Sequence, residues 1–293
     1  MNRFKYFIAR SGLLFMLTAL TLSATFLNAQ EARSMLWKIS GNNLSAPSYL
    51  LGTMHMVCGE DFEITPKIKK ALSQVHTVTF EADIANMEGS EKLMELVQPV
   101  PGILKQARPE QLTALDSLFK ENQLTLDVLN HMSPFGVTSI LTIKAFNCDD
   151  RANVKMMEKE LYNLAVDDSL RIDHLESIEF QINMIRSMNT IDELLTTLKG
   201  IREAPYFMKD LVGVYRSEDL PRLNTLMSDP RFISTDQQSL LLKERNHNWI
   251  KLLPGKMQQS ATLFAVGAGH LGGTDGLIAL LKKQGYTVTP VFD

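Results

Sequence analysis

The first apolar runs of the chain are short and lie on either side of a turn. Residues 36–40 (LWKIS) alternate apolar with polar side chains, and residues 48–52 (SYLLG) form a nearly continuous apolar run. Between them, Gly41-Asn42-Asn43 has the residue types that suit a tight turn. This pattern predicts two strands, the second of them buried.

A helix and a third strand are expected next. Thr65 to Gln74 is predicted to be helical, and Pro66 suits the first helical position. His76 to Glu81 is rich in β-branched residues, which predicts a strand. Strand, helix and strand in this order favour two parallel neighbours joined by a crossover.

The pattern changes between residues 87 and 257, where apolar residues recur every three or four positions and no alternating run stands out. Ile178, Ile182 and Ile185 illustrate this helical spacing. Prolines and glycines separate the predicted helices, at 99–101, 133–134, 200, 221 and 254–255.

The strand pattern returns near the end of the chain. Residues 262–267 (TLFAVG) predict a buried strand, a helix is expected from about Thr274 to Gly285, and residues 286–289 (YTVT) predict a last strand. The sequence therefore predicts an α/β fold, in which a mixed sheet is built from strands at both chain ends and a large helical insertion packs over it.

The N-terminus has the layout of an export signal. Arg3, Lys5 and Arg10 precede an apolar run over residues 12–27, and residues 28–30 resemble a cleavage junction. We therefore expect a periplasmic or secreted protein. The alternative is a helical anchor that is retained.

These patterns divide the chain into a signal peptide at residues 1–29 and a single domain at residues 30–293. Within the domain, residues 30–86 and 258–293 are expected to form the sheet core, and residues 87–257 form the helical insertion.

Charge and hydropathy narrow the range of partners. The 293 residues include 30 basic and 33 acidic side chains, and the N-terminal 29 residues contain only basic ones. The rest of the chain is therefore acidic, which argues against nucleic acid and anionic lipid, because both bind clusters of Lys and Arg. No second apolar run reaches the roughly 20 residues that a membrane crossing needs, so no membrane span is expected in the mature form.

The chain has two cysteines, Cys58 and Cys148. In an exported protein an isolated pair is more often bridged than free, so we expect a disulfide between them. The alternative is two unrelated buried thiols.

Two segments share a Gly-x-x-His motif directly after a predicted buried strand. Gly52 leads to His55, and Gly267 leads to His270. Ligands of open α/β sheets bind beyond the carboxyl ends of the strands, so both imidazoles are expected at one crevice. Glu81 ends another predicted strand, which we expect to be adjacent to the strand that leads to His55.

Two imidazoles and a carboxylate suit a divalent metal ion, and manganese, cobalt and zinc all remain open. A cation at His55, His270 and Glu81 would activate water and polarise a carbonyl. Glu81 would otherwise be a general base. The alternative for each histidine is a simple hydrogen bond to a nearby loop. The remaining histidines have no such context and are interpreted as surface or structural residues: His76, His131, His174 and His247.

Longer segments around these residues resemble a known family. LLGTMHM, VTFEAD, LESIEFQ, ERNHNW and FAVGAGHLGGTDGLIALLKKQGYTV occur in this order. The most specific features are the two Gly-x-x-His motifs, with ERN-x-x-W just before the second. Together they resemble the TraB/GumN family, to which the Tiki proteases are related, over nearly the whole mature chain.

The resemblance implies a metal-dependent hydrolase that acts on a peptide or protein substrate. His55, Glu81 and His270 match the positions of the family's active site. Arg245, in the ERN segment, is expected to orient substrate or stabilise an oxyanion, and its alternative is a salt bridge on the helix surface. Another matched segment contributes residues expected to cap the core or support the site: Glu176, Glu179 and Gln181.

Two other functions stay open at this level. The same groups could hydrolyse a small ester or lactone without metal, with an imidazole activating water. The chain could instead bind a peptide or a haem-like ligand and catalyse nothing. The acidic Glu81 among the histidines favours a cation over an apolar macrocycle.

Overall fold

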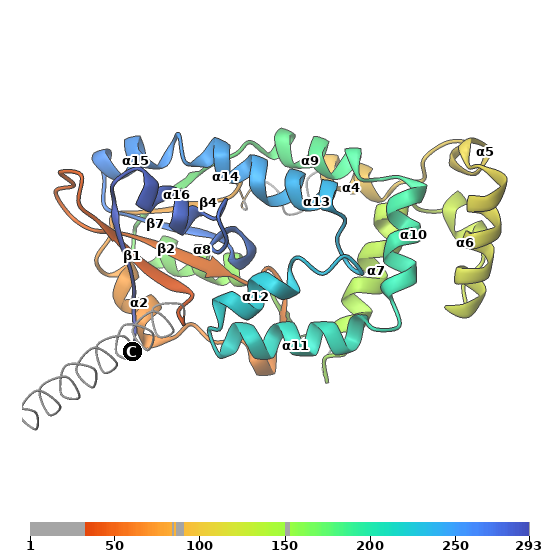
Figure 1. The fold of residues 1–293 in the computed structure, drawn as a ribbon, viewed down its shortest axis with the longest axis horizontal. Helices are drawn as coiled ribbons and strands as arrows, with labels where there is room; N and C mark the ends of the chain where they lie inside the picture. Colours follow the sequence, from red (N-terminus) through yellow and green to blue (C-terminus); the bar gives the residue numbers. More distant parts are fainter. Residues whose placement is uncertain (1–32, 84, 86–90, 150–152, 293) are drawn as a thin grey trace, which may run out of the picture.

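A computed structural model describes residues 33–83, 85, 91–149 and 153–292 (Figure 1). The predicted signal peptide at residues 1–29 lies outside this part of the chain. Within the described residues, no helix has both the length and the apolar character that a membrane crossing requires.

The centre of the molecule is a six-stranded mixed sheet with the order β6-β4-β7-β2-β1-β8. The first four of these strands are parallel to one another, and β1 is antiparallel to both β2 and β8. Strands from both chain ends build most of this sheet, so the predicted α/β fold is confirmed. The strands of the sheet are β1 (Leu36–Ser40), β2 (Ser48–Thr53), β4 (Thr77–Phe80), β6 (Arg171–His174), β7 (Thr262–Gly267) and β8 (Thr287–Pro290).

The expected adjacency of β2 and β4 was wrong. β7, from the end of the chain, lies between them and is parallel to both. A parallel neighbour of β2 needs only a long connection, and both β4 and β7 can be reached by one. The local order of strand, helix and strand therefore does not decide which of the two pairs with β2.

Residues 87–257, which the sequence predicts as a set of helices, also include short strands. They contain β6 at the edge of the main sheet, and β5 (Val154–Lys155), which pairs with β3 (Val57–Cys58). β6 has only four residues, and its two end residues, Arg171 and His174, are exposed. Short strands with polar side chains are typical of sheet edges and lack a clear apolar alternation.

Helices cover the sheet and extend beyond it. Thr65 precedes α2 and Pro66 is its first residue, as the sequence predicts, and the last helix, α16, begins three residues later than expected. The helices are α2 (Pro66–Leu72), α4 (Glu91–Val97), α5 (Ile103–Gln106), α6 (Pro109–Glu121), α7 (Pro134–Phe146), α8 (Met157–Asp167), α9 (Ile178–Ser187), α10 (Ile191–Gly200), α11 (Ala204–Arg216), α12 (Leu220–Leu226), α13 (Thr235–Gln238), α14 (Glu244–Trp249), α15 (Leu253–Gln259) and α16 (Leu277–Lys283).

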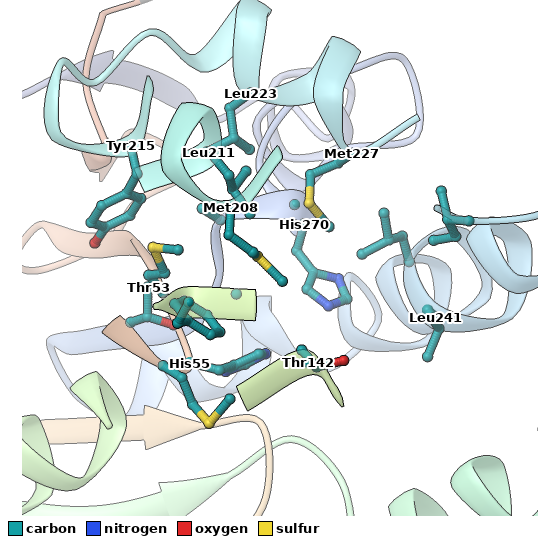
Figure 2. A pocket seen from close by; sticks show the side chains of 18 of the residues that line it. Thr53, His55, Thr142, Met208, Leu211, Tyr215, Leu223, Met227, Leu241 and His270 are labelled. Carbon is teal, nitrogen blue, oxygen red and sulfur yellow. The ribbon is translucent and has the colours of Figure 1, made fainter. Parts of the chain in front are cut away.

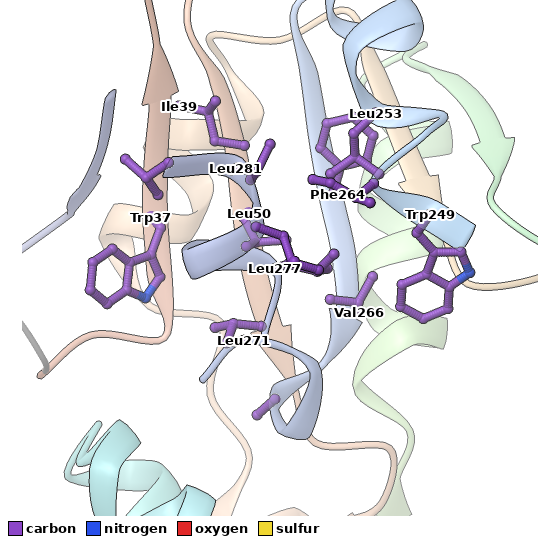
Figure 3. Close-up of a cluster of buried hydrophobic side chains, with 14 of the residues drawn as sticks. Trp37, Ile39, Leu50, Trp249, Leu253, Phe264, Val266, Leu271, Leu277 and Leu281 are labelled. Carbon is purple, nitrogen blue, oxygen red and sulfur yellow. The ribbon is translucent and has the colours of Figure 1, made fainter. Parts of the chain in front are cut away.

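Both faces of the sheet are covered, so β2 and β7 are buried along their whole length and their central residues are apolar. On one face, Leu50 and Phe264 pack with Trp249 and Leu277 from α14 and α16 (Figure 3). On the other face, α2 and α8 cover residues such as Leu51, Val78 and Ala265. Burying two faces fixes the strands rigidly, so the side chains at their carboxyl ends are held in place.

Part of the insertion has a core of its own. Leu115 and Phe119 of α6 pack with Val137 of α7 and with Leu194 and Leu198 of α10. Figure 1 shows α5, α6 and α10 beyond the end of the sheet, with α9 and α11 running back toward it. The insertion is therefore more than a layer on the sheet, because it extends the molecule past the strand ends.

Candidate active site

Four parallel strands place polar side chains at one edge of the sheet. In spatial order, β6 leads to Glu176, β4 to Glu81, β7 to His270 and β2 to His55. Because carboxyl ends of parallel strands meet at the same edge, residues far apart in the sequence come together there. Three of these side chains, Glu176, Glu81 and His270, are joined through Arg245.

His270 is almost fully buried at the end of the turn that follows β7. Its Nδ1 lies 2.7 Å from Asn246 Oδ1, which can only accept, so this nitrogen carries the proton. The Nη1 group of Arg245 donates to His270 Nε2 at 3.2 Å, and the Trp249 ring lies 4.4 Å from the imidazole. Burial lowers the pKa of His270 to about 3, so this imidazole is neutral.

Arg245 bridges two buried carboxylates. Its Nη2 donates to Glu81 Oε2 at 2.5 Å and to Glu176 Oε2 at 2.9 Å, and its Nε donates to Glu176 Oε1 at 3.0 Å. Nη1 donates to His270 and to the carbonyl of Leu241. All five N–H groups of the guanidinium thus have acceptors. Arg245 is 5% exposed, so the alternative of a salt bridge on the helix surface does not hold. The arrangement also leaves no N–H for an oxyanion.

Glu81 is held as a carboxylate. Burial opposes its ionisation, but Arg245 and the backbone N–H of Gly267, which donates to Oε1 at 2.7 Å, help to lower the pKa of Glu81 to about 2. Trp249 Nε1 donates to Glu176 Oε1 at 2.8 Å. One guanidinium against two carboxylates, beside a neutral His270, leaves an excess of negative charge in a buried cluster, which favours a cation.

His55 has the opposite surroundings. Its side chain is 61% exposed, and its Nδ1 lies 2.7 Å from Oε1 of Glu158, a buried carboxylate in the first turn of α8. Thr53 Oγ1 donates to the same oxygen at 2.5 Å. The charge of Glu158 raises the pKa of His55 to about 9. The two motif histidines therefore differ in charge at neutral pH.

The Nε2 atoms of both motif histidines and Oε1 of Glu81 lie close together beside Gly267. A Cβ at this position would lie 3.1 Å from His55 Nε2 and 3.3 Å from Glu81 Oε1. His270 Nε2 lies 3.6 Å from the same Glu81 oxygen. Each histidine turns its Nδ1 to a protein acceptor and its Nε2 toward this point. Histidines that ligate metals are oriented in this way by a second hydrogen bond.

The donor set suits a divalent cation in the chemistry of its atoms. Two imidazole nitrogens and a carboxylate are ligands for manganese, cobalt or zinc, and the missing Cβ of Gly267 leaves a cradle between them. Among the described residues, no group of three or more His, Cys, Asp or Glu is already arranged in a metal-binding geometry. Arg245 is bonded to both Glu81 and His270, so these donors would have to adjust around an ion.

A cavity of about 380 Å³ opens onto this cluster. His55, His270 and Arg245 lie on its wall, together with Gly267 and the side chains of α7, α11 and α12 (Figure 2). Leu241 and Leu242, which also line it, belong to a π-helical turn at Ser239–Lys243 that runs directly into α14. Such π-helical turns are frequent at functional sites.

A disulfide between Cys58 and Cys148 lies close to this wall, as the sequence predicts. Cys58 belongs to β3 and lies three residues after His55. Cys148 lies two residues after Phe146, the last residue of α7, and Phe146 lines the cavity. The bridge therefore ties the segment after His55 to the helical insertion, next to the β3-β5 pair that precedes Glu158.

Several residues of the site have no clear signal in the sequence. Glu158 lies in the insertion, 103 residues from its partner His55, and no motif marks it. Asn246 and Trp249 could have been found, because both belong to the ERN-x-x-W segment. Of the other matched residues, Gln181 donates to Glu176, whereas Glu179 is exposed and pairs with Lys92.

Comparisons with known proteins agree on one family. The model of the TraB/PrgY/gumN family matches residues 35–290. Metalloprotease TIKI2 of Danio rerio is 21% identical over 321 aligned residues, which cover 88% of this chain and 61% of the relative. The chain thus spans less than two thirds of that relative's length. No solved structure matches the chain.

Proposed function

Because the chain belongs to the TraB/PrgY/gumN family, we propose that it is an exported, metal-dependent hydrolase that cleaves peptide bonds. The similarity to a protein named as a metalloprotease supports this reaction class and a peptide or protein as substrate. The convergence of two imidazoles and a carboxylate beside Gly267 is the observation that carries the proposal.

In this proposal, His55, His270 and Glu81 hold manganese, cobalt or zinc. When bound, the cation supplies Lewis acidity, which polarises the scissile carbonyl and acidifies water. Glu81 is a ligand or the general base. Its low pKa keeps it ionised, which suits a metal ligand better than a base, because a carboxylate with so low a pKa accepts protons weakly. The described contacts favour a positioning role for Arg245, which holds Glu81 ionised and His270 in place.

The test is peptide hydrolysis by purified variants. His55→Ala, His270→Ala and Glu81→Gln should each abolish cleavage of a peptide library and reduce metal uptake, while circular dichroism stays close to wild type. His131→Ala is the matched control, because His131 is exposed and pairs only with Asp127. Mass spectrometry with and without added Mn²⁺ measures cleavage. Wild-type rates in the His55 or His270 variant would falsify the site.

A second candidate is metal-independent hydrolysis of an ester or lactone by the same groups. The opposite pKa shifts of His55 and His270 favour it, because a charged and a neutral imidazole at one site can act as acid and base. Chelation distinguishes the two functions. Hydrolysis that survives removal of all divalent metal supports the second candidate, and loss of hydrolysis that returns with Mn²⁺, Co²⁺ or Zn²⁺ supports the first.

A further inference from the structure

The cavity beside the candidate active site has an apolar wall. Its lining includes the methionines 54, 56, 208 and 227 and several leucines. Methionine is flexible and polarizable, so a surface rich in it can adapt to apolar groups of different shape. The volume of about 380 Å³ is at the lower end of ligand sites, which span roughly 300–1,000 Å³. This size suits a short apolar group.

The polar groups on this wall are mostly committed to protein partners. Thr53 donates to Glu158, Tyr215 donates to the carbonyl of Gly52 at 2.9 Å, and the N–H groups of Arg245 are all engaged. Among the described residues that line the cavity, only His55 and Arg245 carry a charge at neutral pH. A charged substrate group placed among the methionines and leucines, away from these two residues, would therefore lose its hydration without gaining an ion pair.

A second cavity of different character abuts the first. It has a volume of about 390 Å³ and shares Gly269 and Leu242 with the apolar cavity. Its other lining residues are polar or glycine, among them Asn224, Gln238 and Lys243. The two cavities thus meet at the turn that carries His270. An apolar site next to a polar one suits a chain of mixed residues better than a wholly apolar ligand.

We propose that the apolar cavity binds a large uncharged side chain, such as that of Phe, Leu or Met, adjacent to the peptide bond that is cleaved. This inference rests on the proposed function and adds a substrate preference to it. Burying one such side chain in a fitted pocket is expected to favour the apolar substrate over a charged one by about 10–100-fold in kcat/KM.

The first experiment compares hexapeptides that differ at one position, with Phe, Leu, Gly, Asp or Lys. Cleavage by the full-length mature protein is followed by mass spectrometry in the presence of Mn²⁺. The expected result is a preference for Phe and Leu at one position next to the cut. Cleavage with no apolar preference at any position overturns the inference and leaves the proposed function intact.

Met208→Arg tests whether this cavity is responsible. Met208 lies on α11 and lines the cavity, whereas Tyr206 on the same helix is 78% exposed and does not. Met208→Arg should lower kcat/KM for the Phe peptide at least tenfold and raise it for the Asp peptide, while Tyr206→Arg should change neither. Equal effects of the two variants would place the preference elsewhere.

Binding separates this inference from a failure of catalysis. If no peptide is cleaved, the proposed function fails, and fluorescence anisotropy of labelled Phe and Asp peptides then tests the cavity directly. Tighter binding of the Phe peptide by tenfold or more, lost in Met208→Arg, supports the inference. Equal binding of both peptides, or stronger binding of decanoate or haemin than of the Phe peptide, overturns it.

Discussion

The two Gly-x-x-His motifs have the same local design and opposite surroundings. Both follow central parallel strands of the sheet, β2 and β7, which are hydrogen-bonded neighbours. His270 is buried, neutral and held by Asn246 and Arg245 of α14. His55 is 61% exposed, charged and held by Glu158 of α8. The motif places each histidine at the carboxyl edge of the sheet. Residues on helices that are distant in the sequence determine whether its imidazole is charged.

This difference indicates a division of labour within the site. The His270 side is a closed cluster in which Arg245 contacts His270, Glu81 and Glu176. Removing one member leaves the others buried without their partner, so it should strongly lower the stability of the protein. The His55 side depends on a short segment tied by the β3-β5 pair and the disulfide. Changes on this side should lower the stability of the protein less, and they should mainly move His55 out of position relative to Glu81 and His270. The following predictions test this contrast, from the largest expected effect to the smallest.

Arg245→Ala should be the most damaging change, because it leaves Glu81 and Glu176 buried near each other without a cation. Breaking a buried pair of this kind lowers the free energy of unfolding by about 3–5 kcal/mol. Urea denaturation measures the loss. Arg222→Ala, which removes an exposed pair with Asp210, is the control and should cost about 1 kcal/mol at most. Equal stability of the two variants would contradict the closed cluster.

Loss of the disulfide should lower the stability of the whole domain and loosen the His55 side the most. The double variant Cys58→Ser and Cys148→Ser opens a link between residues 90 positions apart, which should cost about 2–4 kcal/mol in the free energy of unfolding. Hydrogen exchange should quicken most around residues 57–58, where local opening adds to the loss of global stability, and less in the buried strand β7. A thiol titration of the unfolded, unreduced wild type should find no free thiol. Two thiols would refute the bridge.

The two motif glycines should respond differently to alanine. A Cβ at Gly52 would lie 2.9 Å from Leu271 and 3.0 Å from the backbone of Ala268, so Gly52→Ala should cost about 1–3 kcal/mol in stability. A Cβ at Gly267 meets the exposed His55 ring at 3.1 Å, which can move aside, and Glu81 Oε1 at 3.3 Å, which needs to shift by only a few tenths of an ångström.

Gly267→Ala should therefore keep most of the stability and lose most of the hydrolysis and metal binding. Denaturation and peptide cleavage are measured on both variants. Gly213→Ala is the control, because a Cβ on this residue of α11 has open space around it. A stable, fully active Gly267→Ala protein would argue against the convergence beside this glycine.

The sequence predicts the parts of this molecule that depend on short-range patterns. The central residues of β2 and β7 are apolar because both faces of the sheet are covered, and each motif histidine follows within three residues of the end of its strand. The carboxyl edge of the sheet is therefore predictable from residues that are neighbours in the chain. Glu81 follows from the same pattern, because it ends a predicted strand, and the family resemblance adds Arg245.

The remaining features depend on contacts between distant segments. β7 separates β2 from β4 because strand order is decided by which long connection closes, and local patterns do not carry that information. Glu158 reaches His55 only because α8 packs under β2 and β4. Arg245 is on a short polar helix segment whose burial follows from the two carboxylates it meets.

The smallest expected effect is a difference in the pH dependence of stability, measured on metal-free protein by urea denaturation at a series of pH values. His55 has a pKa of about 9 in the folded chain, against about 6.5 when unfolded. Its contribution is full below pH 6.5 and is lost as the pH rises through 9. His270 has a folded pKa of about 3. Below about pH 6.5 the unfolded chain therefore takes up a proton that the folded chain does not, and stability falls from there toward pH 5.

His55→Asn should flatten only the alkaline limb of the stability curve and His270→Asn only the acidic one, because each removes one titrating group. The reverse assignment, or no change in either limb, would show that the two imidazoles do not differ in charge.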